Sequence, residues 1–417
     1  MVSSSLVSAQ NRVESPFIIV KIGNYTFGAC SDLSNRRKMQ QVMKVTFPNY
    51  MQSLNIVKVN GAVNTYTLRM EYGITEVDDP NMLEKVFSSV SKSREIKLSY
   101  GDWNAPAFIY KEETAIITKV ASNVDFNNSK IIYNVTCVSS ALSLKAGNFS
   151  FGAKHAKPSD VIIDLLKNEA YGLSTIFTGM RNITKVNLNS LIARDDKKVK
   201  IEAKDSINIL DYIAYLVNCM VDQNDTEGEL KKSNYFWAVY DDTNNSYGGT
   251  YFKIIKVTAG TQYNVSYSTY EVDIGYPSGS YVTSFTVNSD NTWSILYDYS
   301  KEVQQPQYSY SINKEGEIVS VESPAITKSS KYLKTTEADR TWWTQMTQFP
   351  ITAKLQIKGL LRPTLLMTYV KVNTYFFGHK HVSSGLYIIT RQEDSIDSSG
   401  YKTTLSLTRI SGDTSYA

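Results

Sequence analysis

Cysteine is scarce in this chain of 417 residues, which contains three: Cys30, Cys137 and Cys219. They lie far apart, and no two of them form a Cys-x-x-Cys pair. This spacing excludes a disulfide framework and the usual cysteine-rich zinc sites. Cys30 and Cys137 stand in apolar, strand-like stretches, so we predict free and buried thiols.

Long apolar runs are also missing. No uninterrupted apolar run approaches the roughly 18 residues that a membrane span needs. The N-terminal stretch Met1–Gln10 has neither the basic start nor the apolar segment of a signal peptide. We therefore expect the protein to be made and folded in a reducing cytoplasm.

Neither sign of charge is in large excess. The 44 Lys and Arg residues nearly balance 40 Asp and Glu residues, which gives a formal net charge of +4. Nucleic-acid binders normally cluster their basic residues, and the most basic run here, Arg194–Lys200, contains its own acids. We predict no specific nucleic-acid binding, and we interpret this run as a solvated loop.

Histidine is rare as well, with three copies. His379 and His381 share one side of an extended segment and could form half of a metal site. No third ligand stands at a suitable spacing, because the nearest acids, Glu393 and Asp394, are remote in sequence. A turn or an interface explains the pair better. His155, beside two lysines at a predicted domain junction, is expected to be exposed.

Two acidic loops are candidates for cation sites. The loop Asp222–Gly228 resembles a calcium loop, but an EF-hand requires Gly at its sixth position and Glu at its twelfth. Those positions hold Glu227 and Ser233, so we interpret the segment as a surface loop. A hairpin turn explains Asp241–Gly249. No phosphate-binding loop, dinucleotide fingerprint or Gly-x-Ser-x-Gly elbow is present.

Adjacent acids could in principle serve a glycosidase, and two such pairs occur, Asp78–Asp79 and Glu112–Glu113. Neighbouring residues on a strand point to opposite faces, however, and Asp79 is better explained as a helix cap. We therefore predict no catalytic residue, no cofactor, no metal and no enzymatic activity.

Tyrosine, by contrast, is abundant, with 29 copies against 15 Phe and 5 Trp. Together with Thr, Val and Ile, tyrosine favours strands. It also suits protein interfaces, because its ring is apolar and its hydroxyl forms hydrogen bonds. A/T-rich codon usage would raise Tyr, Asn, Lys and Ile together, and this explanation stays open beside the first.

The strongest pattern lies near the C-terminus. Apolar residues alternate there at Leu355 and Ile357, at Val370 and Val372, and at Leu405 and Leu407. This is the period of half-buried strands, and Gly, Pro, Asp and Ser separate them. We predict a β-barrel domain of four antiparallel strands over residues 346–417, with Leu355, Ile357, Leu405 and Leu407 pointing inward.

The remaining chain is predicted to form three further domains. Residues 1–152 read as a β-barrel with one helix, at Asp79–Val90. Residues 153–230 form an α+β module with two amphipathic helices, one opened by Pro158 and ended by Gly172, the other capped by Asp205–Ser206. Residues 231–345 form a β-hairpin-rich region with a polar loop or arm at 322–340. Strands are predicted at 17–22, 44–47, 55–59, 65–71, 95–100, 108–117, 130–139, 235–240, 251–257, 281–287, 292–297, 308–312 and 317–321.

Several short motifs, in this order, resemble the tail hub proteins of tailed bacteriophages, especially the baseplate hubs of contractile tails. They are the strand end Ile357-Lys-Gly359, the strand start Ser384-Gly-Leu-Tyr387 and the finish Gly400-Tyr-Lys-Thr-Thr-Leu-Ser-Leu407. Upstream, Lys157–Leu166, Asp205–Val217 and the strand Phe236–Tyr240 resemble helices and strands of the same family. The resemblance covers most of residues 15–410 and is weakest over 258–340.

The resemblance implies a structural virion protein located in the tail. The fold would be mainly β with inserted helices, built on two small barrels of the tube-protein kind. The subunit would form a homotrimer that joins the hexameric tail tube to the trimeric central spike. Its partners would be the tube protein, the spike or tail-tip protein, the tape-measure protein and neighbouring baseplate proteins. Two alternatives remain: a tail-associated cell-wall hydrolase or glycan-binding module, and a spike component of a contractile injection or secretion system.

Overall fold

The computed structural model describes the greater part of the chain. The described residues are 15–30, 47–48, 51–73, 86–87, 95–102, 110–171, 173, 191–226, 230–241, 250–260, 268–274, 282–292, 308–312, 318–322, 337–359, 366–377 and 379–412. Within them the fold is mainly β with a few helices, which is the predicted class.

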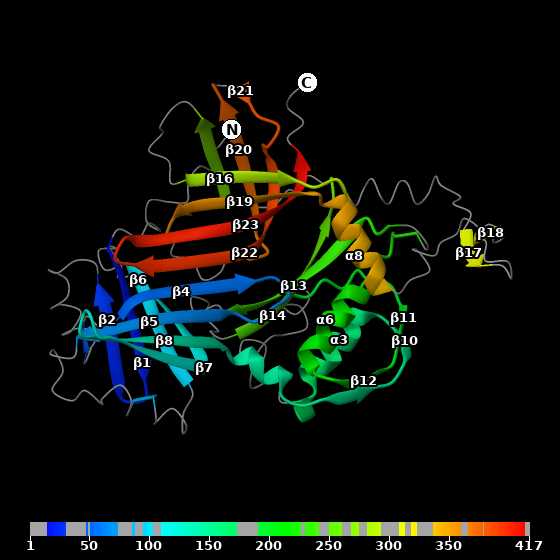
Figure 1. The fold of residues 1–417 in the computed structure, drawn as a ribbon. Coiled ribbons are helices and arrows are strands. Elements are labelled where there is room, and N and C mark those ends of the chain that lie inside the picture. Colours follow the sequence, from blue (N-terminus) through cyan, green and yellow to red (C-terminus); the bar gives the residue numbers. More distant parts are fainter. Residues whose placement is uncertain are drawn as a thin grey trace.

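A single 15-stranded sheet joins the two ends of the chain (Figure 1). Its main path runs β16-β19-β23-β22-β4-β5-β8-β7-β6-β1-β2-β3. The contact between the N-terminal and C-terminal halves is an antiparallel ladder of β4 (Met51–Val59) and β22 (Gly385–Asp397), in which Ile56 faces Asp394. The two β units therefore lie side by side, as predicted.

The N-terminal unit buries one face of nearly every strand. Along β4 and β5 the inward positions alternate with half-exposed ones, which is the pattern of a sheet with one apolar face. Its other strands are β1 (Pro16–Ile22), β2 (Tyr25–Cys30), β3 (Phe47–Pro48), β5 (Thr65–Gly73), β6 (Glu95–Asp102), β7 (Tyr110–Asp125) and β8 (Lys130–Ser139). Of the predicted helix Asp79–Val90, only Val86 and Phe87 are described, and both are helical.

The closing unit contains the four predicted strands, β19 (Ile351–Lys358), β20 (Tyr369–Phe376), β22 and β23 (Gly400–Gly412), with the short β21 (His379–Lys380) beside β20. Leu355, Ile357, Leu405 and Leu407 are each no more than 2% exposed, which confirms their inward orientation. Leu355 pairs directly with Leu405 across β19 and β23.

Two strands from the hairpin-rich region complete this unit. β15 (Ser268–Ile274) pairs in parallel with β20, and β16 (Val282–Ser289) pairs antiparallel with β19. The first of these strands has no counterpart in the sequence prediction. The hydrogen-bonded sheet therefore extends across residue 345, where the sequence prediction placed a domain boundary.

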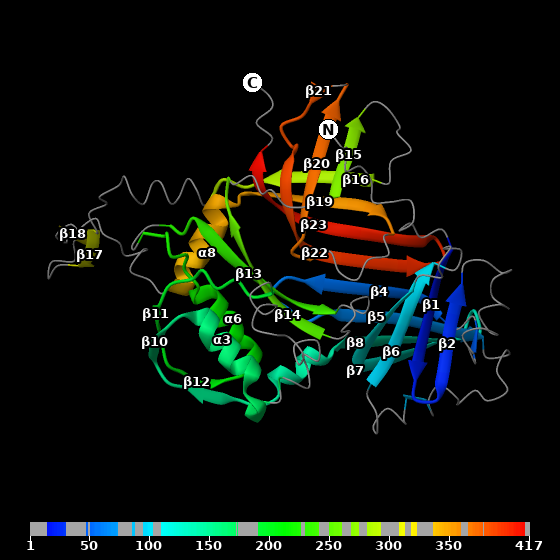
Figure 2. The same cartoon turned by 180° about the vertical axis from the view of Figure 1, so that it is seen from behind.

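The helical module lies to one side of the sheet, in both views (Figures 1 and 2). α3 (Pro158–Lys167) begins at Pro158 as predicted, but it ends before Asn168 and not at Gly172. α6 (Ile209–Cys219) is capped by Asn208, whose side chain accepts a hydrogen bond from the Asp211 amide. The predicted cap at Asp205–Ser206 is wrong, because these residues belong to β12 (Lys204–Ile207).

Short elements surround these two helices: η3 (Ser140–Lys145), β9 (Phe149–Phe151), β10 (Lys154–Ala156), η4 (Glu169–Tyr171), β11 (Val199–Ile201) and β12 (Lys204–Ile207). β10 pairs with β11, and β9 pairs with β12. The face-to-face rings of Phe151 and Tyr212, with centroids 3.8 Å apart, pack this layer against α6.

β13 (Ser233–Asp241) and β14 (Thr250–Thr258) form the predicted hairpin, and this hairpin connects the module to the sheet. Trp237 and Ile254 pack into the core of the helical module, whereas Ala238 packs into the core of the closing unit. A second, separate hairpin pairs β17 (Tyr308–Ile312) with β18 (Ile318–Glu322).

A further helix, α8 (Glu337–Gln348), packs against α6 and β13. The sequence prediction placed a polar loop over the first part of this segment and missed the helix. No helix among the described residues is long and apolar enough to cross a membrane.

Candidate functional site

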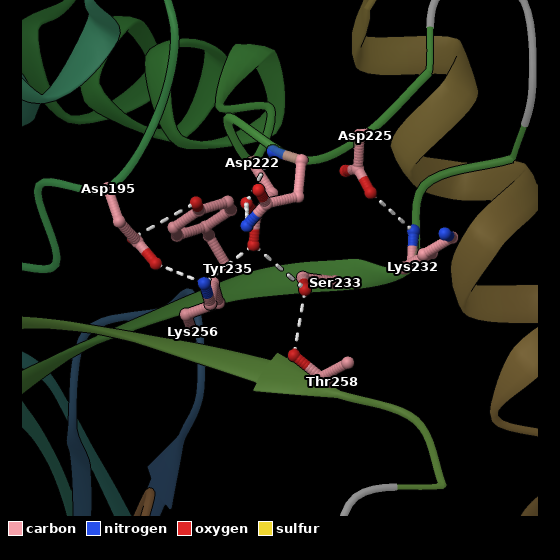
Figure 3. Close-up of polar contacts among 9 residues, drawn as sticks. Asp195, Asp222, Asp225, Lys232, Ser233, Tyr235, Lys256 and Thr258 are labelled. Carbon is pink, nitrogen blue, oxygen red and sulfur yellow. Dashed lines mark hydrogen bonds and ion pairs between the residues drawn. The ribbon is translucent and has the colours of Figure 1, made fainter.

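A buried polar network lies where the sequence predicted two solvated loops (Figure 3). Asp196 is fully buried, and Asp222 and Asp225 are each 5% exposed. Both loop interpretations, for Arg194–Lys200 and for Asp222–Gly228, are therefore wrong at these aspartates. Asp222 turns inward because Lys256 and Ser233 on the β13–β14 hairpin meet it. Asp196 and Asp225 are met by other partners, described below.

Lys256 on β14 is the centre of the network. Its ammonium forms ion pairs with Asp195 and with Asp222, the latter at 2.6 Å from Oδ2. On the neighbouring strand, the Tyr235 hydroxyl donates to Asp195 Oδ1 at 3.2 Å, and the Ser233 hydroxyl donates to Asp222 Oδ2 at 3.3 Å. These contacts fasten the hairpin to the segment after α6 and to residues 191–199.

The charges of the network stabilise one another. Burial alone would raise the pKa of Asp222, but hydrogen bonds from the Asn224 amide and Lys256 outweigh it and hold the pKa below its ordinary value. Burial alone would lower the pKa of Lys256, and its two aspartates raise it instead. Burial and the nearby Asp195 raise the pKa of Tyr235, so this hydroxyl stays protonated.

Two further aspartates complete the connection to neighbouring elements. Asp196 accepts hydrogen bonds from the Ser159 amide at 2.9 Å and from the Ser159 hydroxyl at 2.5 Å. Ser159 lies in the first turn of α3, where amides lack helical partners, so Asp196 caps this helix from outside. Asp225 Oδ1 accepts from the Lys232 amide at 2.9 Å. The arrangement is that of a structural joint.

A second buried cluster lies inside the N-terminal unit. Glu113, 4% exposed, accepts hydrogen bonds from Lys58 at 2.7 Å and from the hydroxyls of Tyr66 and Tyr100 at 2.6 Å each. Burial alone would raise the pKa of Glu113, but Lys58 and the two tyrosines hold it below its ordinary value. Glu113 faces inward, as expected for one member of an adjacent pair on a strand.

This cluster continues into the closing unit. The rings of Tyr100 and Tyr401 meet edge to face, with centroids 6.4 Å apart. Asp394, fully buried on β22, accepts from Gln392 at 2.7 Å and from Thr403 at 2.6 Å. Burial and the charge of Asp394 raise the pKa of Tyr401. The ring contact of Tyr100 and Tyr401 therefore joins the two polar clusters across the two units.

The histidines form a turn, consistent with the interpretation from sequence. His379 lies in β21, and His381 Nδ1 is 2.8 Å from the Ser383 hydroxyl. His155 is exposed, in β10. Within the described part of the chain, no group of three or more His, Cys, Asp and Glu side chains is arranged to hold a metal ion.

The thiol of Cys137 is free and buried, as predicted, and the thiol of Cys219 is free and buried as well. Burial raises the pKa of Cys137 to about 12, so this thiol is unreactive at neutral pH. The side chain of Cys30 lies outside the described residues.

Some large apolar side chains are exposed instead of buried. Phe126, at the tip of the β7–β8 hairpin, is 84% exposed, and Phe377, after β20, is 67% exposed. Single apolar residues exposed in this way are common on protein surfaces. The sequence prediction identified none of them, because exposure of a single apolar residue carries no periodic signal.

Comparisons with known proteins found no matching family model and no matching curated protein. Among solved structures, the chain is similar to the 43 kDa tail protein of prophage MuSo2 from Shewanella oneidensis. The identity is 11%, the TM-score is 0.46, and the match covers 94% of this chain and 96% of the other. A tail protein from Neisseria meningitidis MC58 matches with 8% identity, a TM-score of 0.47 and the same coverage.

A third similar structure is the E. coli c3393 protein, a component of the type VI secretion system with structural similarity to the T4 bacteriophage tail proteins gp27 and gp5. Its identity is 8% and its TM-score 0.44, over 87% of this chain and 75% of the other. Two of these three solved structures are tail proteins, and the third is a component of a secretion system.

Proposed function

We propose that this protein is a structural component of a phage tail, the trimeric hub that joins the hexameric tail tube to the trimeric central spike. One structural observation carries the proposal: the N-terminal and closing β units lie side by side, joined by the β4–β22 ladder. A chain that presents two adjacent β units offers two neighbouring contact surfaces, and three such chains offer six.

The matching of symmetries gives the physical reason. Three copies of one chain do not match a six-fold tube unless each copy supplies two similar contacting units. The order of motifs over residues 15–410 supports the same role, because it resembles that of tail hub proteins. The tape-measure protein and neighbouring baseplate proteins are further partners in this proposal.

The division of the chain follows from this role. Units at 1–152 and 346–417, the latter completed by β15 and β16, would form the ring wall. The module at 153–230 and the rest of 231–345 would lie outside it. The position of α3 and α6 to one side of the sheet agrees with this arrangement (Figure 1).

The proposed role requires no active site. The two buried acid clusters fasten elements together: Glu113 lies between strands of one unit, and Asp222 lies between a hairpin and a helix end. Neither acid presents an exposed carboxylate to a substrate, since both are 5% exposed or less.

The test is assembly with a tail tube. The full chain is mixed with a tail tube protein from the same genome, and complexes are measured by light scattering and electron microscopy. We expect three chains of 46.9 kDa each in a ring that caps the end of a tube. A protein that stays monomeric, and binds neither tube nor spike, would refute the hub role.

A further inference from the structure

Lys256 lies between two carboxyl groups that differ in their surroundings (Figure 3). Its Nζ atom contacts Oδ2 of Asp195 and lies 2.6 Å from Oδ2 of Asp222. The side chain of Asp195 is 44% exposed, whereas that of Asp222 is 7% exposed. One amine is thus in direct contact with an open carboxyl group and with a buried one. Such a set allows one carboxyl group to move protons while the other reacts with the nitrogen.

Asp222 is held in place by hydrogen bonds to both of its oxygens. Oδ1 accepts from the backbone amide of Asn224 at 2.9 Å and from its side-chain amide at 3.2 Å, and Oδ2 accepts from the Ser233 hydroxyl at 3.3 Å. These donors stabilise the carboxylate, so its carbon is a poor target for a nucleophile. Its Oδ2 also faces the Lys256 ammonium, where it can accept a proton and return it.

Asp195 has the surroundings of a carboxyl group that reacts. Its Oδ2 contacts the Lys256 ammonium, and its Oδ1 accepts from the Tyr235 hydroxyl at 3.2 Å. A donor at this second oxygen stabilises the negative charge that develops there when a nucleophile adds to the carbon. Burial and the nearby Asp195 raise the pKa of Tyr235, so the donor keeps its proton.

Backbone contacts hold the two reacting side chains near each other. The Ala193 amide donates to the Ile254 carbonyl oxygen on β14 at 3.1 Å, and the Gln223 amide donates to the Asp195 carbonyl oxygen at 3.2 Å. Lys256 follows Ile254 by two residues, so its side chain lies on the same face of β14. Groups fixed in contact react as if their concentration were up to about 10⁵–10⁸ M, which offsets the competition from water that limits such condensations in free solution.

We propose that Lys256 and Asp195 join in an isopeptide bond, an amide between Lys256 Nζ and Asp195 Cγ that forms with release of one water molecule. Asp222 serves as the proton carrier, and the Tyr235 hydroxyl donates to the oxygen that becomes the amide carbonyl. The bond fixes the β13–β14 hairpin covalently to residues 191–199. This inference goes beyond the hub role and does not rest on it.

The step balances without a cofactor or an oxidant. Lys256 gives one ammonium proton to Asp222, which passes it to Oδ2 of Asp195. The lone pair of the amine then forms the Nζ–Cγ bond, and the carbonyl electron pair moves to Oδ1, beside the Tyr235 hydroxyl. Nζ gives a second proton through Asp222 to the Oδ2 hydroxyl, the Cγ–Oδ2 bond breaks, and this group leaves as water. The Asp222 carboxylate is restored, and one positive and one negative charge are removed.

Mass spectrometry of the full chain, denatured only after it has folded, tests the bond. We expect an intact mass lower than that of the linear sequence by the mass of one water molecule. After proteolysis, fragmentation should identify one branched peptide that contains both Asp195 and Lys256. The ion pair of Lys130 and Glu71 is the internal control, because Lys130 is 47% exposed and its ammonium stays hydrated, so these two residues should appear in separate peptides.

Three variants assign the roles. Lys256→Arg keeps a positive charge between the two acids, but its guanidinium stays protonated, so this variant should have the linear mass. Asp222→Asn removes the proton carrier while Lys256 keeps its contact with Asp195, and it should have the linear mass as well. Asp160→Asn is the matched control, because it removes an aspartate from an exposed pair with Arg194 and should leave the link intact. Circular dichroism establishes that each variant is folded.

A folded wild-type chain with the linear mass, unchanged after days of incubation, would show an ion pair only and overturn the inference. Loss of water that maps to another pair of residues, or that persists in Lys256→Arg, would overturn it as well. A fully linked Asp222→Asn variant would refute the role of Asp222 as proton carrier. Trimer formation and tube binding are measured separately, so failure of this inference leaves the hub role standing.

Discussion

Gly359 lies directly against the side chain of Tyr401, and its amide donates a hydrogen bond to the Tyr401 carbonyl oxygen at 2.7 Å. A Cβ atom at position 359 would stand 2.6 Å from the Tyr401 Cβ, closer than real Cβ contacts allow. The glycine that ends β19 is therefore required by close packing on β23, and not by a turn.

Gly359→Ala should destabilise the protein by about 1–3 kcal/mol, the usual cost of overpacking a well-packed site. Denaturant unfolding measures the change. Gly152→Ala is the matched control, since a Cβ there would meet no atom within 4 Å. Equal unfolding midpoints for both variants would contradict the packing argument.

Leu405→Ala tests the core of the closing unit. Leu405 is fully buried and faces Leu355, so truncation leaves a cavity and should cost about 2–5 kcal/mol. Thermal or denaturant unfolding provides the measurement. Val382→Ala, at a position 67% exposed, should change stability by less than about 0.5 kcal/mol. If Leu405→Ala is as stable as Val382→Ala, the side chain of Leu405 does not belong to the core.

The closing strands could be predicted because period-two alternation is a local property. Leu355, Ile357, Leu405 and Leu407 all point inward as the pattern requires. α3 could be predicted for a similar reason, since Pro158 and a helical apolar face are local signals. The end of that helix, at Asn168 instead of Gly172, depends on packing and was missed.

The interpretation of the two loops as solvated was wrong because the partners of their buried acids are distant in the sequence. Asp196 and Asp222 lie in polar stretches, which favour exposure, but their partners Ser159 and Lys256 stand 37 and 34 residues away. No pattern within either loop reports such a partner. α8 was missed because polar residues surround its few apolar positions, and it is stabilised by packing on α6.

The sequence predicts that the two β units lie side by side, but it does not predict that β4 and β22 are the strands that pair. β4 and β22 lie far apart in the sequence. Which strands pair at such a separation depends on tertiary packing, which no short motif encodes. The inward acids Glu113 and Asp394, on either side of this junction, occupy alternating positions of their strands. An acidic residue at an inward position of an alternating strand could therefore have indicated the buried polar cluster.

Glu113→Gln should cost about 3–5 kcal/mol, because it leaves the buried ammonium of Lys58 without its counter-charge. Unfolding at neutral pH measures the loss. Glu71→Gln is the control, since its partners Lys130 and Arg69 are 47% and 49% exposed, and such pairs contribute about 0–1 kcal/mol. A similar, small loss in both variants would show that Glu113 is not held by its charge.

The same contact predicts a pH dependence. The folded-state pKa of Glu113 lies below its ordinary value of 4.5, so its stabilisation is complete above that pH. The stabilisation is lost as pH falls through the lowered folded-state pKa. Wild type should therefore lose stability below pH 4.5 more steeply than Glu113→Gln. Parallel pH curves for the two proteins would contradict this linkage.

Asp222→Asn should loosen the joint between the β13–β14 hairpin and the helical module. Lys256 and Ser233 would lose a charged acceptor, at a local cost of about 1–3 kcal/mol. Hydrogen exchange of β13 and β14 should quicken while that of β5 stays unchanged. Asp160→Asn breaks an exposed pair with Arg194 and should affect neither. Uniform exchange changes over the whole chain would mean that the joint is not a local unit.

The purified protein should leave peptidoglycan and cell-wall polysaccharides intact, with the turbidity of a cell-wall suspension constant over hours. The physical reason is the state of its acids. Glycoside hydrolysis needs one carboxyl group that donates a proton to substrate and a second on the opposite side of the bond. Glu113 is buried behind Tyr66 and Tyr100 with its pKa lowered, so it neither reaches a sugar nor holds a proton near neutral pH. Clearing of the suspension by wild type, and its loss in a folded Asp or Glu variant, would return the protein to the hydrolase alternative.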